Sequence, residues 1–131
     1  MIGLDTNVLV RYFAQDDPAQ SKKANLLIES LTVERPGYVT LVALVEVVWV
    51  LGRAYRAARD EIAQVVETLL RTKELVVEAS ETVWQALRLF ANSSADFSDC
   101  LIERAGYRAQ CEHTVTFDAK AAKSAGMRLI K

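Results

Sequence analysis

Apolar residues in this chain form short runs that alternate with longer amphipathic stretches. Five short apolar segments lack strict alternation: residues 1–4, 37–39, 75–77, 114–117 and 127–130. A strand buried on both faces of a sheet has this pattern, because neither face needs polar side chains. The longer stretches place apolar residues three or four positions apart, which predicts helices. Strands that alternate with helices predict an α/β protein whose parallel sheet is covered on both sides.

Polar residues and glycines predict where the helices begin and end. Asp17 and Pro18 suit the cap and the first turn of a helix that reaches about Ser30. Three further helices are predicted to open at Asp60, at Ser80, and at Asp96 or Ser98. Gly126 is placed to end a short last helix that follows Asp118.

The segment 41–51 is apolar apart from Glu46, and its many valines are also typical of a strand. Its length favours a buried helix, and Gly52 is the predicted end of that helix.

Length and charge exclude several classes of protein. With 131 residues, the chain is expected to be one domain over residues 1–131. The net charge of −1 creates no general attraction for nucleic acid, although a local basic rim remains compatible with it. The longest apolar run, about eleven residues, is too short to span a bilayer, and no signal peptide is visible. We therefore expect a cytoplasmic protein that does not interact with a membrane.

The sequence lacks the residues that several common kinds of catalytic centre need. The two cysteines have no C-x-x-C spacing and His113 is the only histidine, so a zinc site would be short of ligands. No serine or cysteine is paired with a histidine and a supporting acid, which argues against a nucleophilic triad. No glycine-rich phosphate loop is present either, so nucleoside triphosphate binding has little support.

Acidic residues stand where the chain changes from apolar to polar or helical pattern. Asp5 follows the segment 1–4, and Asp118 ends the segment 114–117. Glu46 interrupts the apolar run, while Asp99 opens a helical pattern one turn after Asp96. In an open α/β sheet, ligands bind at the carboxyl ends of the strands, where Asp5 and Asp118 are expected.

Such acids are expected to be partly buried, where like charges repel and raise their pKa values. A divalent cation removes this conflict, and carboxylate oxygens suit Mg²⁺ or Mn²⁺. The ion can orient a phosphodiester, stabilise its developing charge and supply a hydroxide-like nucleophile.

Each acid also has a simpler interpretation. Asp5 and Asp118 could each only cap a helix, and Asp96 and Asp99 have the spacing of a cap and its third residue. Glu46 would need a partner, such as Arg53 or Arg11, because an unpaired buried charge is costly. One shared metal site explains all these positions at once, so we favour it.

Basic and aromatic residues near these acids allow two interpretations. The candidates for contact with a nucleic-acid backbone are Arg53, Arg56 and Lys120. The simpler interpretation is a solvated surface, which is the more common role of such residues and the one that we favour. The aromatic residues predicted to lie in the core are Trp49, Trp84 and Phe90.

These acidic segments resemble those of the PIN-domain family. Residues 2–9 (Ile-Gly-Leu-Asp-Thr-Asn-Val-Leu) are similar to its first strand ending in Asp-Thr-Asn, and residues 44–51 to its glutamate-bearing helix. Residues 95–102 resemble the third acidic motif, and residues 116–118 the fourth. The resemblance covers residues 1–130, and the length and the glutamate helix are most similar to VapC toxins of bacterial toxin–antitoxin pairs.

The resemblance implies a three-layer α/β/α sandwich around a central parallel sheet of four to five strands. It also implies an endoribonuclease that uses Mg²⁺ or Mn²⁺ to hydrolyse the RNA backbone. Carried over by position, the metal-binding acids are Asp5, Glu46, Asp99 and Asp118, with Asp96 as an adjoining acid. Residues in supporting positions are Thr6, Asn7 and Thr116. A homodimer and a cognate VapB-type antitoxin, which would form a heterocomplex with the toxin, are further implications.

Two other functions remain open on the sequence. The chain could be a PIN-like RNA-binding module that acts through its partner and RNA occupancy without cleavage. It could also hydrolyse another phosphate ester. Some phosphatases of that kind carry a second aspartate two positions after the nucleophile, where this chain has Asn7.

Overall fold

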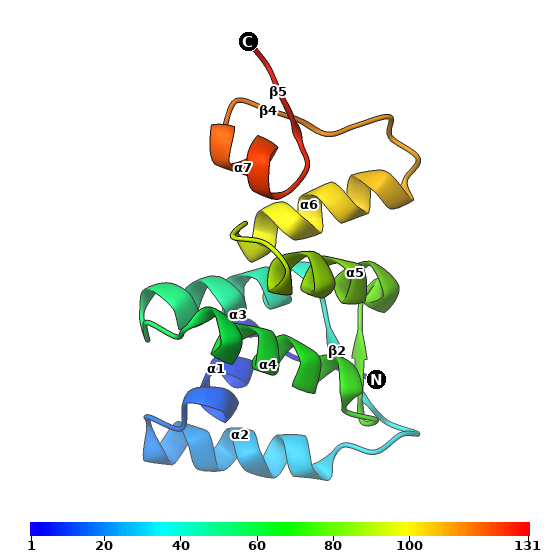
Figure 1. Ribbon diagram of the computed structural model, residues 1–131. Coiled ribbons are helices and arrows are strands. Elements are labelled where there is room, and N and C mark those ends of the chain that lie inside the picture. Colours follow the sequence, from blue (N-terminus) through cyan, green and yellow to red (C-terminus); the bar gives the residue numbers. More distant parts are fainter. The chain divides into compact units, whose positions relative to one another are not determined.

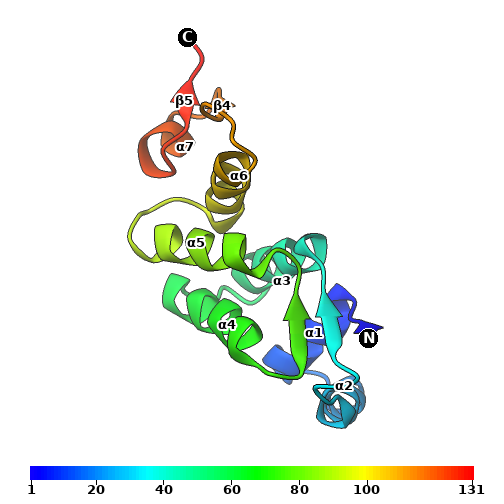
Figure 2. The same cartoon turned by 90° about the vertical axis from the view of Figure 1, so that its right-hand side faces the viewer.

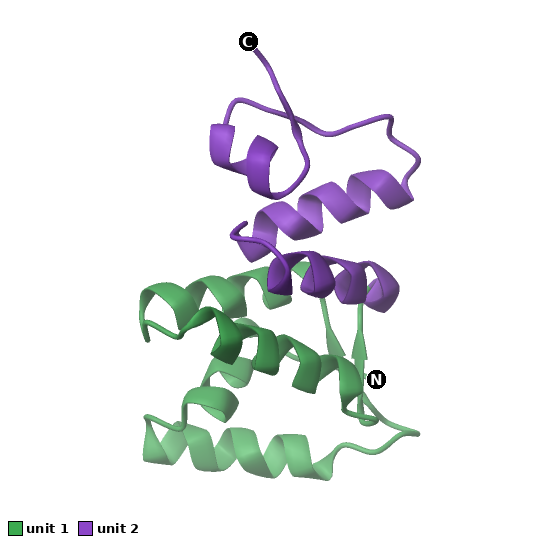
Figure 3. Cartoon of the chain, in the orientation of Figure 1, with its two compact units in different colours: residues 1–78 green, residues 79–131 purple.

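The computed structural model describes all 131 residues, which form two compact units, residues 1–78 and residues 79–131 (Figure 3). The first unit contains, in chain order, β1 (Ile2–Gly3), α1 (Thr6–Ala14), α2 (Pro18–Ser30), β2 (Gly37–Val39), α3 (Leu41–Arg53), α4 (Arg59–Arg71) and β3 (Leu75–Val77) (Figure 1). The second unit contains α5 (Ser80–Ala91), α6 (Phe97–Arg108), β4 (Val115–Thr116), α7 (Ala119–Ser124) and β5 (Arg128–Leu129). The predicted alternation of strands and helices is confirmed.

The strands of the first unit form one parallel sheet in the order β1-β2-β3, in which β2 and β3 lie side by side (Figure 2). Gly37 pairs with both Ile2 and Leu75. The predicted strands at 37–39 and 75–77 are confirmed, and the predicted strand at 1–4 is present but shorter. Beyond the end of β1, the Leu4 N–H donates to the Tyr38 carbonyl at 3.0 Å, which fixes where the chain leaves the sheet.

The core of the first unit is centred on α3, which packs against α1 and α4. Its fully buried side chains are Leu9, Val39, Leu44, Val47, Val66 and Leu69. Thr40 caps α3, because its hydroxyl oxygen accepts the Ala43 N–H at 3.1 Å. The helical interpretation of residues 41–51 is therefore confirmed. Its predicted end at Gly52 is wrong, because the Ala54 N–H still donates to the Val50 carbonyl at 2.8 Å and the helix runs on to Arg53.

The predicted start of α4 at Asp60 is also wrong, since the helix begins at Arg59 after Ala58. The Glu61 carboxylate reaches back and accepts the Ala58 N–H at 2.9 Å. Asp60 instead lies in the first turn, where its negative charge is favourable near the positive end of the helix dipole. The helix start is thus set by an acid three residues inside it rather than by a polar cap.

Gly37 lies where neighbouring side chains come so close to the backbone of β2 that a Cβ would not fit. A Cβ at this position would lie 2.8 Å from a methyl carbon of Leu4 and 2.9 Å from methyl carbons of Leu31 and Leu75. We expect Gly37→Ala to lower the free energy of unfolding by about 1–3 kcal/mol through overpacking. Gly3→Ala is the matched control, because a Cβ there meets nothing within 4 Å. Urea denaturation of both variants measures the difference, and equal effects would contradict this packing.

In the second unit, α5 packs on α6, and the rings of Phe90 and Phe97 meet edge to face at 5.7 Å. The strands β4 and β5 pair in parallel around α7. Gly126 follows the end of α7 with a φ of +80°, the left-handed conformation that ends helices, so its predicted role is confirmed. Every strand pair in the protein is parallel, as predicted, within a three-stranded and a two-stranded sheet.

The aromatic residues predicted for the core differ in their environments. Phe90 is buried, which confirms its prediction, and Trp84 is partly buried. The prediction is wrong for Trp49, which is 61% exposed on α3. Trp49 lies on the face of α3 opposite to Leu44 and Val47, and the Arg53 guanidinium lies 5.7 Å from its ring centroid. None of the helices combines the length and the apolar character needed to cross a membrane.

Candidate metal-binding acids

The first unit places Asp5 at the N-cap of α1, directly after β1. Its Oδ1 accepts the Thr6 N–H at 2.8 Å, so the capping role that the sequence allowed is confirmed. The Thr6 hydroxyl in turn donates to Glu46 Oε1 at 2.8 Å and joins the start of α1 to the middle of α3. Carboxylate oxygens accept several bonds, so capping leaves Asp5 with lone pairs for a further ligand.

Glu46 differs from its expected environment. The expected partial burial is wrong, because Glu46 is exposed, and its hydrogen-bond partner is Thr6 rather than the Arg53 or Arg11 that the simpler interpretation would have needed. Arg11 is engaged elsewhere, with Asp16. Glu46 therefore avoids the cost of a buried charge through its position on the open side of α3.

The second unit contains three acids whose charges act on one another. Burial, followed by the charges of Asp96 and Asp118, raises the pKa of the half-buried Asp99, while Lys120 opposes this effect. Asp96 is the N-cap of α6, yet its side chain makes no capping bond and faces the Lys120 ammonium at 3.4 Å. The predicted conflict between like charges is thus confirmed at Asp99.

Asp118 caps α7, as the simpler interpretation of the sequence allowed. Its Oδ1 accepts the N–H groups of Lys120 at 2.8 Å and Ala121 at 3.4 Å. The Asp118 N–H donates to the Thr116 hydroxyl oxygen at 3.0 Å, so Thr116 contacts the acid that it was predicted to support.

The expectation of partial burial is wrong for Asp5, Glu46 and Asp118, all of which are exposed. Neither unit brings three His, Cys, Asp or Glu side chains together in an arrangement that could hold a metal ion. The donor chemistry nevertheless fits a hard divalent cation, because the groups are carboxylates supported by threonine hydroxyls. A cation near Asp99 would also offset the burial and the repulsion from Asp96 and Asp118 that raise its pKa.

The candidate RNA contacts lie in different settings. Arg53 and Arg56 are both exposed just beyond the core of α3, and Arg56 has a positive φ of 54°. Lys120 is paired with Asp96, which offsets part of its charge. Two of the three basic candidates are thus accessible to a phosphate, and the third is partly neutralised.

Sequence reasoning missed a polar cluster formed by Arg11, Asp16, Gln20 and Tyr55, here called the Arg11 cluster. The Tyr55 hydroxyl donates to Asp16 Oδ2 at 2.6 Å and accepts from Arg11 Nη1 at 3.0 Å. Arg11 Nε donates to Gln20 Oε1 at 2.7 Å. The hydrogen bond that Tyr55 donates is the main cause that lowers the pKa of Asp16, and the bond that Arg11 donates to the Tyr55 hydroxyl is the main cause that raises the pKa of Arg11. No spacing along the chain could have indicated this cluster, because Tyr55 is far from the other residues in sequence.

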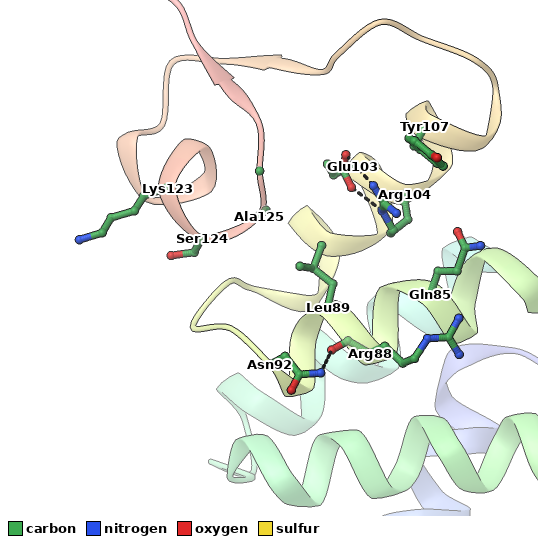
Figure 4. Close-up of a pocket in the computed structure, with 11 residues that line it drawn as sticks. Gln85, Arg88, Leu89, Asn92, Glu103, Arg104, Tyr107, Lys123, Ser124 and Ala125 are labelled. Carbon is green, nitrogen blue, oxygen red and sulfur yellow. Dashed lines mark hydrogen bonds and ion pairs between the residues drawn. The ribbon is translucent and has the colours of Figure 1, made fainter.

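A hollow of about 860 Å³ lies within the second unit, between α5, α6 and the end of α7 (Figure 4). Its walls include Glu103 and Arg104, which form an ion pair, and Tyr107, whose ring centroid lies 4.4 Å from the Arg104 guanidinium. Gln85 Oε1 is buried there without a hydrogen-bond partner. None of the predicted metal-binding acids lines this hollow, so it is separate from the candidate site.

Residues 2–126 match the PIN domain family, and this match includes every acid described above. The chain therefore belongs to the PIN domain family, which confirms the resemblance inferred from the acidic motifs. It is also 26% identical over 98 residues to the VapC ribonuclease of Aquifex aeolicus (strain VF5), which covers 75% of this chain and 73% of that protein. The similarity to VapC proteins is confirmed as well.

Proposed function

We propose that this protein is a metal-dependent endoribonuclease that hydrolyses RNA phosphodiester bonds, as the toxin of a VapBC-type toxin–antitoxin pair. The observation that carries the proposal is the family match over residues 2–126, which contains all four acids of the predicted set. The similarity to a VapC ribonuclease supports RNA as the substrate class.

The proposed metal-binding and catalytic acids are Asp5, Glu46, Asp99 and Asp118, with Asp96 beside Asp99. They would hold Mg²⁺, or Mn²⁺ in its place, because both prefer oxygen ligands. When bound, such an ion would orient the scissile phosphate, stabilise its developing charge and lower the pKa of a water molecule.

The chain's own residues orient these acids. Thr6 holds Glu46 Oε1 through its hydroxyl, and the Thr6 N–H holds Asp5 Oδ1. The Thr116 hydroxyl fixes the backbone of Asp118, whose carboxylate is held by the first N–H groups of α7. Asp5, Glu46 and Asp118 are therefore held by hydrogen bonds, which reduces the rearrangement needed when a cation and a phosphate bind.

The test is cleavage of a mixed pool of structured cellular RNAs by the purified protein. Reactions contain Mg²⁺, Mn²⁺ or EDTA, and the control is Asp5→Asn protein prepared identically. Discrete cuts that require the metal and vanish in the variant are the expected result. Cuts that are equally strong with Asp5→Asn would overturn the proposal. RNA binding without any cleavage would favour the alternative of an RNA-binding module.

Replacement of Thr6 tests the support of Glu46 separately. Thr6→Val keeps the shape of the side chain but removes the hydroxyl that bonds to Glu46. We expect a loss of about 10- to 100-fold in metal affinity or cleavage, as is typical when the group that orients a metal ligand is removed. Thr6→Ser should restore most of that loss, because serine keeps the donor. Thr6→Val activity equal to that of the unaltered protein would show that this bond is not needed.

The proposal extends to partners and fold. We expect a homodimer, or a heterocomplex with a cognate VapB-type antitoxin, in the cytoplasm and without membrane binding. The proposed architecture is a single PIN domain over residues 1–131, a three-layer α/β/α sandwich with a central parallel sheet of four to five strands. The parallel pairing within the three-stranded and the two-stranded sheet supports the parallel arrangement of the strands in this assignment. A monomeric elution profile of the lone chain at micromolar concentration would contradict the dimer.

A further inference from the structure

A smaller pocket, of about 260 Å³, lies in the first unit between α1 and α2. Its apolar lining consists of Val8 from α1 and of Ala24 and Leu27 from α2. Its polar lining includes Asn7, Arg11 and Lys23. The α2 residues that line it are spaced three or four apart, so they form one face of that helix. The pocket therefore has an apolar floor and a polar edge.

The polar edge carries positive charge without an acidic lining residue. The Lys23 ammonium is exposed and makes no ion pair or hydrogen bond within the protein. Arg11 is held through Nε by Gln20 and through Nη1 by Asp16 and Tyr55, which leaves its Nη2 without a partner. Asp16 offsets part of the Arg11 charge, so Lys23 is the main source of attraction for an anion. The Arg11 cluster gives the guanidinium a fixed orientation before any ligand arrives.

Asn7, which lines the pocket, lies in the first turn of α1, two residues after Asp5. Asn7 makes no side-chain hydrogen bond in the protein, so its amide is available to a ligand. A ligand that enters here would therefore contact the first turn of α1, the helix that Asp5 caps. The volume is below the range of about 300–1,000 Å³ typical of drug-sized ligands, and it suits a unit no larger than one nucleotide.

We propose that this pocket binds one nucleotide of the RNA chain next to the scissile phosphate, and this inference rests on the proposed nuclease function. Lys23 and the free Nη2 of Arg11 contact the phosphate, and Asn7 bonds to polar atoms of the sugar or base. Val8, Ala24 and Leu27 contact the nonpolar face of the nucleotide. An apolar floor with cations at its edge is complementary to a nucleotide, which joins an aromatic base to an anionic phosphate.

The experiment measures RNA binding without cleavage. A fluorescein-labelled single-stranded RNA decamer is titrated with protein in EDTA, and anisotropy gives the dissociation constant at several salt concentrations. The variants are Lys23→Met and the matched control Lys22→Met, an exposed lysine on the same turn of α2 that does not line the pocket. We expect Lys23→Met to weaken binding about 3- to 10-fold and to lower the salt slope by about 0.7, the value for one phosphate contact on a single strand.

Equal binding and equal salt slopes for the two variants would overturn the inference. Failure of the unaltered protein to bind at about 100 µM, the weak end of nonspecific affinity, would overturn it too. Neither result decides the nuclease proposal, which is judged by metal-dependent cleavage. Conversely, selective loss of binding in Lys23→Met from a protein that cuts no RNA would support nucleotide binding in the pocket, would favour the RNA-binding module and would overturn the placement next to a scissile phosphate.

Discussion

Asp99→Asn is expected to reduce RNA cleavage by about 100-fold or more while leaving the metal-free protein at least as stable at neutral pH. The loss of activity follows because a bound metal ion is worth several kcal/mol of transition-state stabilisation, and a neutral amide is a weaker ligand than the carboxylate it replaces. The gain in stability follows because burial and the charges of Asp96 and Asp118 disfavour the ionised carboxylate.

The pH dependence of this effect has a defined sign. The pKa of Asp99 is higher in the folded protein than in an unfolded chain, so the protonated form is favoured on folding. The contribution of Asp99 to stability is complete at pH values below the ordinary aspartate pKa. It is lost as the pH rises through the pKa that Asp99 has in the folded protein. Relative to the unaltered protein, Asp99→Asn should therefore gain stability between about pH 4 and pH 7.

Urea denaturation in EDTA across that range measures the difference. Glu112→Gln is the control, because Glu112 is an exposed acid of the same unit without a hydrogen bond or an ion pair. If Asp99→Asn cleaves RNA as well as the unaltered protein does, Asp99 is not one of the metal-binding acids. A stability difference that does not change with pH would show that the carboxylate charge is not the cause.

Leu44→Ala is expected to lower the free energy of unfolding by about 2–5 kcal/mol, the usual cost of a cavity in a packed core. Leu44 is fully buried at the centre of the first unit. Val42→Ala on the same helix is the control, because Val42 is 72% exposed and its truncation should cost no more than about 0.5 kcal/mol.

Chemical denaturation of both proteins gives the comparison. Because Leu44 lies two residues before Glu46, residual cleavage by folded Leu44→Ala protein also reports whether the helix still presents that acid. Similar losses for the two variants would mean that α3 is not packed by the face that contains Leu44.

Local patterns in the sequence predicted most of the secondary structure. The strands at 37–39 and 75–77 and the helix that starts at Pro18 are present where apolar runs and capping residues placed them. The errors arose where a neighbouring residue could take the same role. Asp60 was predicted to cap α4, but the Glu61 carboxylate accepts the Ala58 N–H and sets the start of the helix. Trp49 was misplaced because the apolar run 41–51 gives α3 more hydrophobic residues than its buried face can hold.

The candidate acids were found from the sequence, but their partners were not. Thr6 as the partner of Glu46, and the bonds that Tyr55 makes to Asp16 and Arg11, join residues about forty positions apart. Such contacts depend on how helices pack, which no pattern within one segment specifies. The charge conflict at Asp99 was predictable because Asp96 is one helical turn away.

The positions of the two tryptophans give each unit its own optical reporter. Trp49 lies in residues 1–78 and Trp84 in residues 79–131, and the chain has no others. With Trp84→Phe the intrinsic fluorescence would come mainly from an exposed indole of the first unit, and with Trp49→Phe from a partly buried indole of the second. Two urea transitions with the same midpoint would show that the chain unfolds as one cooperative system. Separate midpoints would assign each unit a stability of its own.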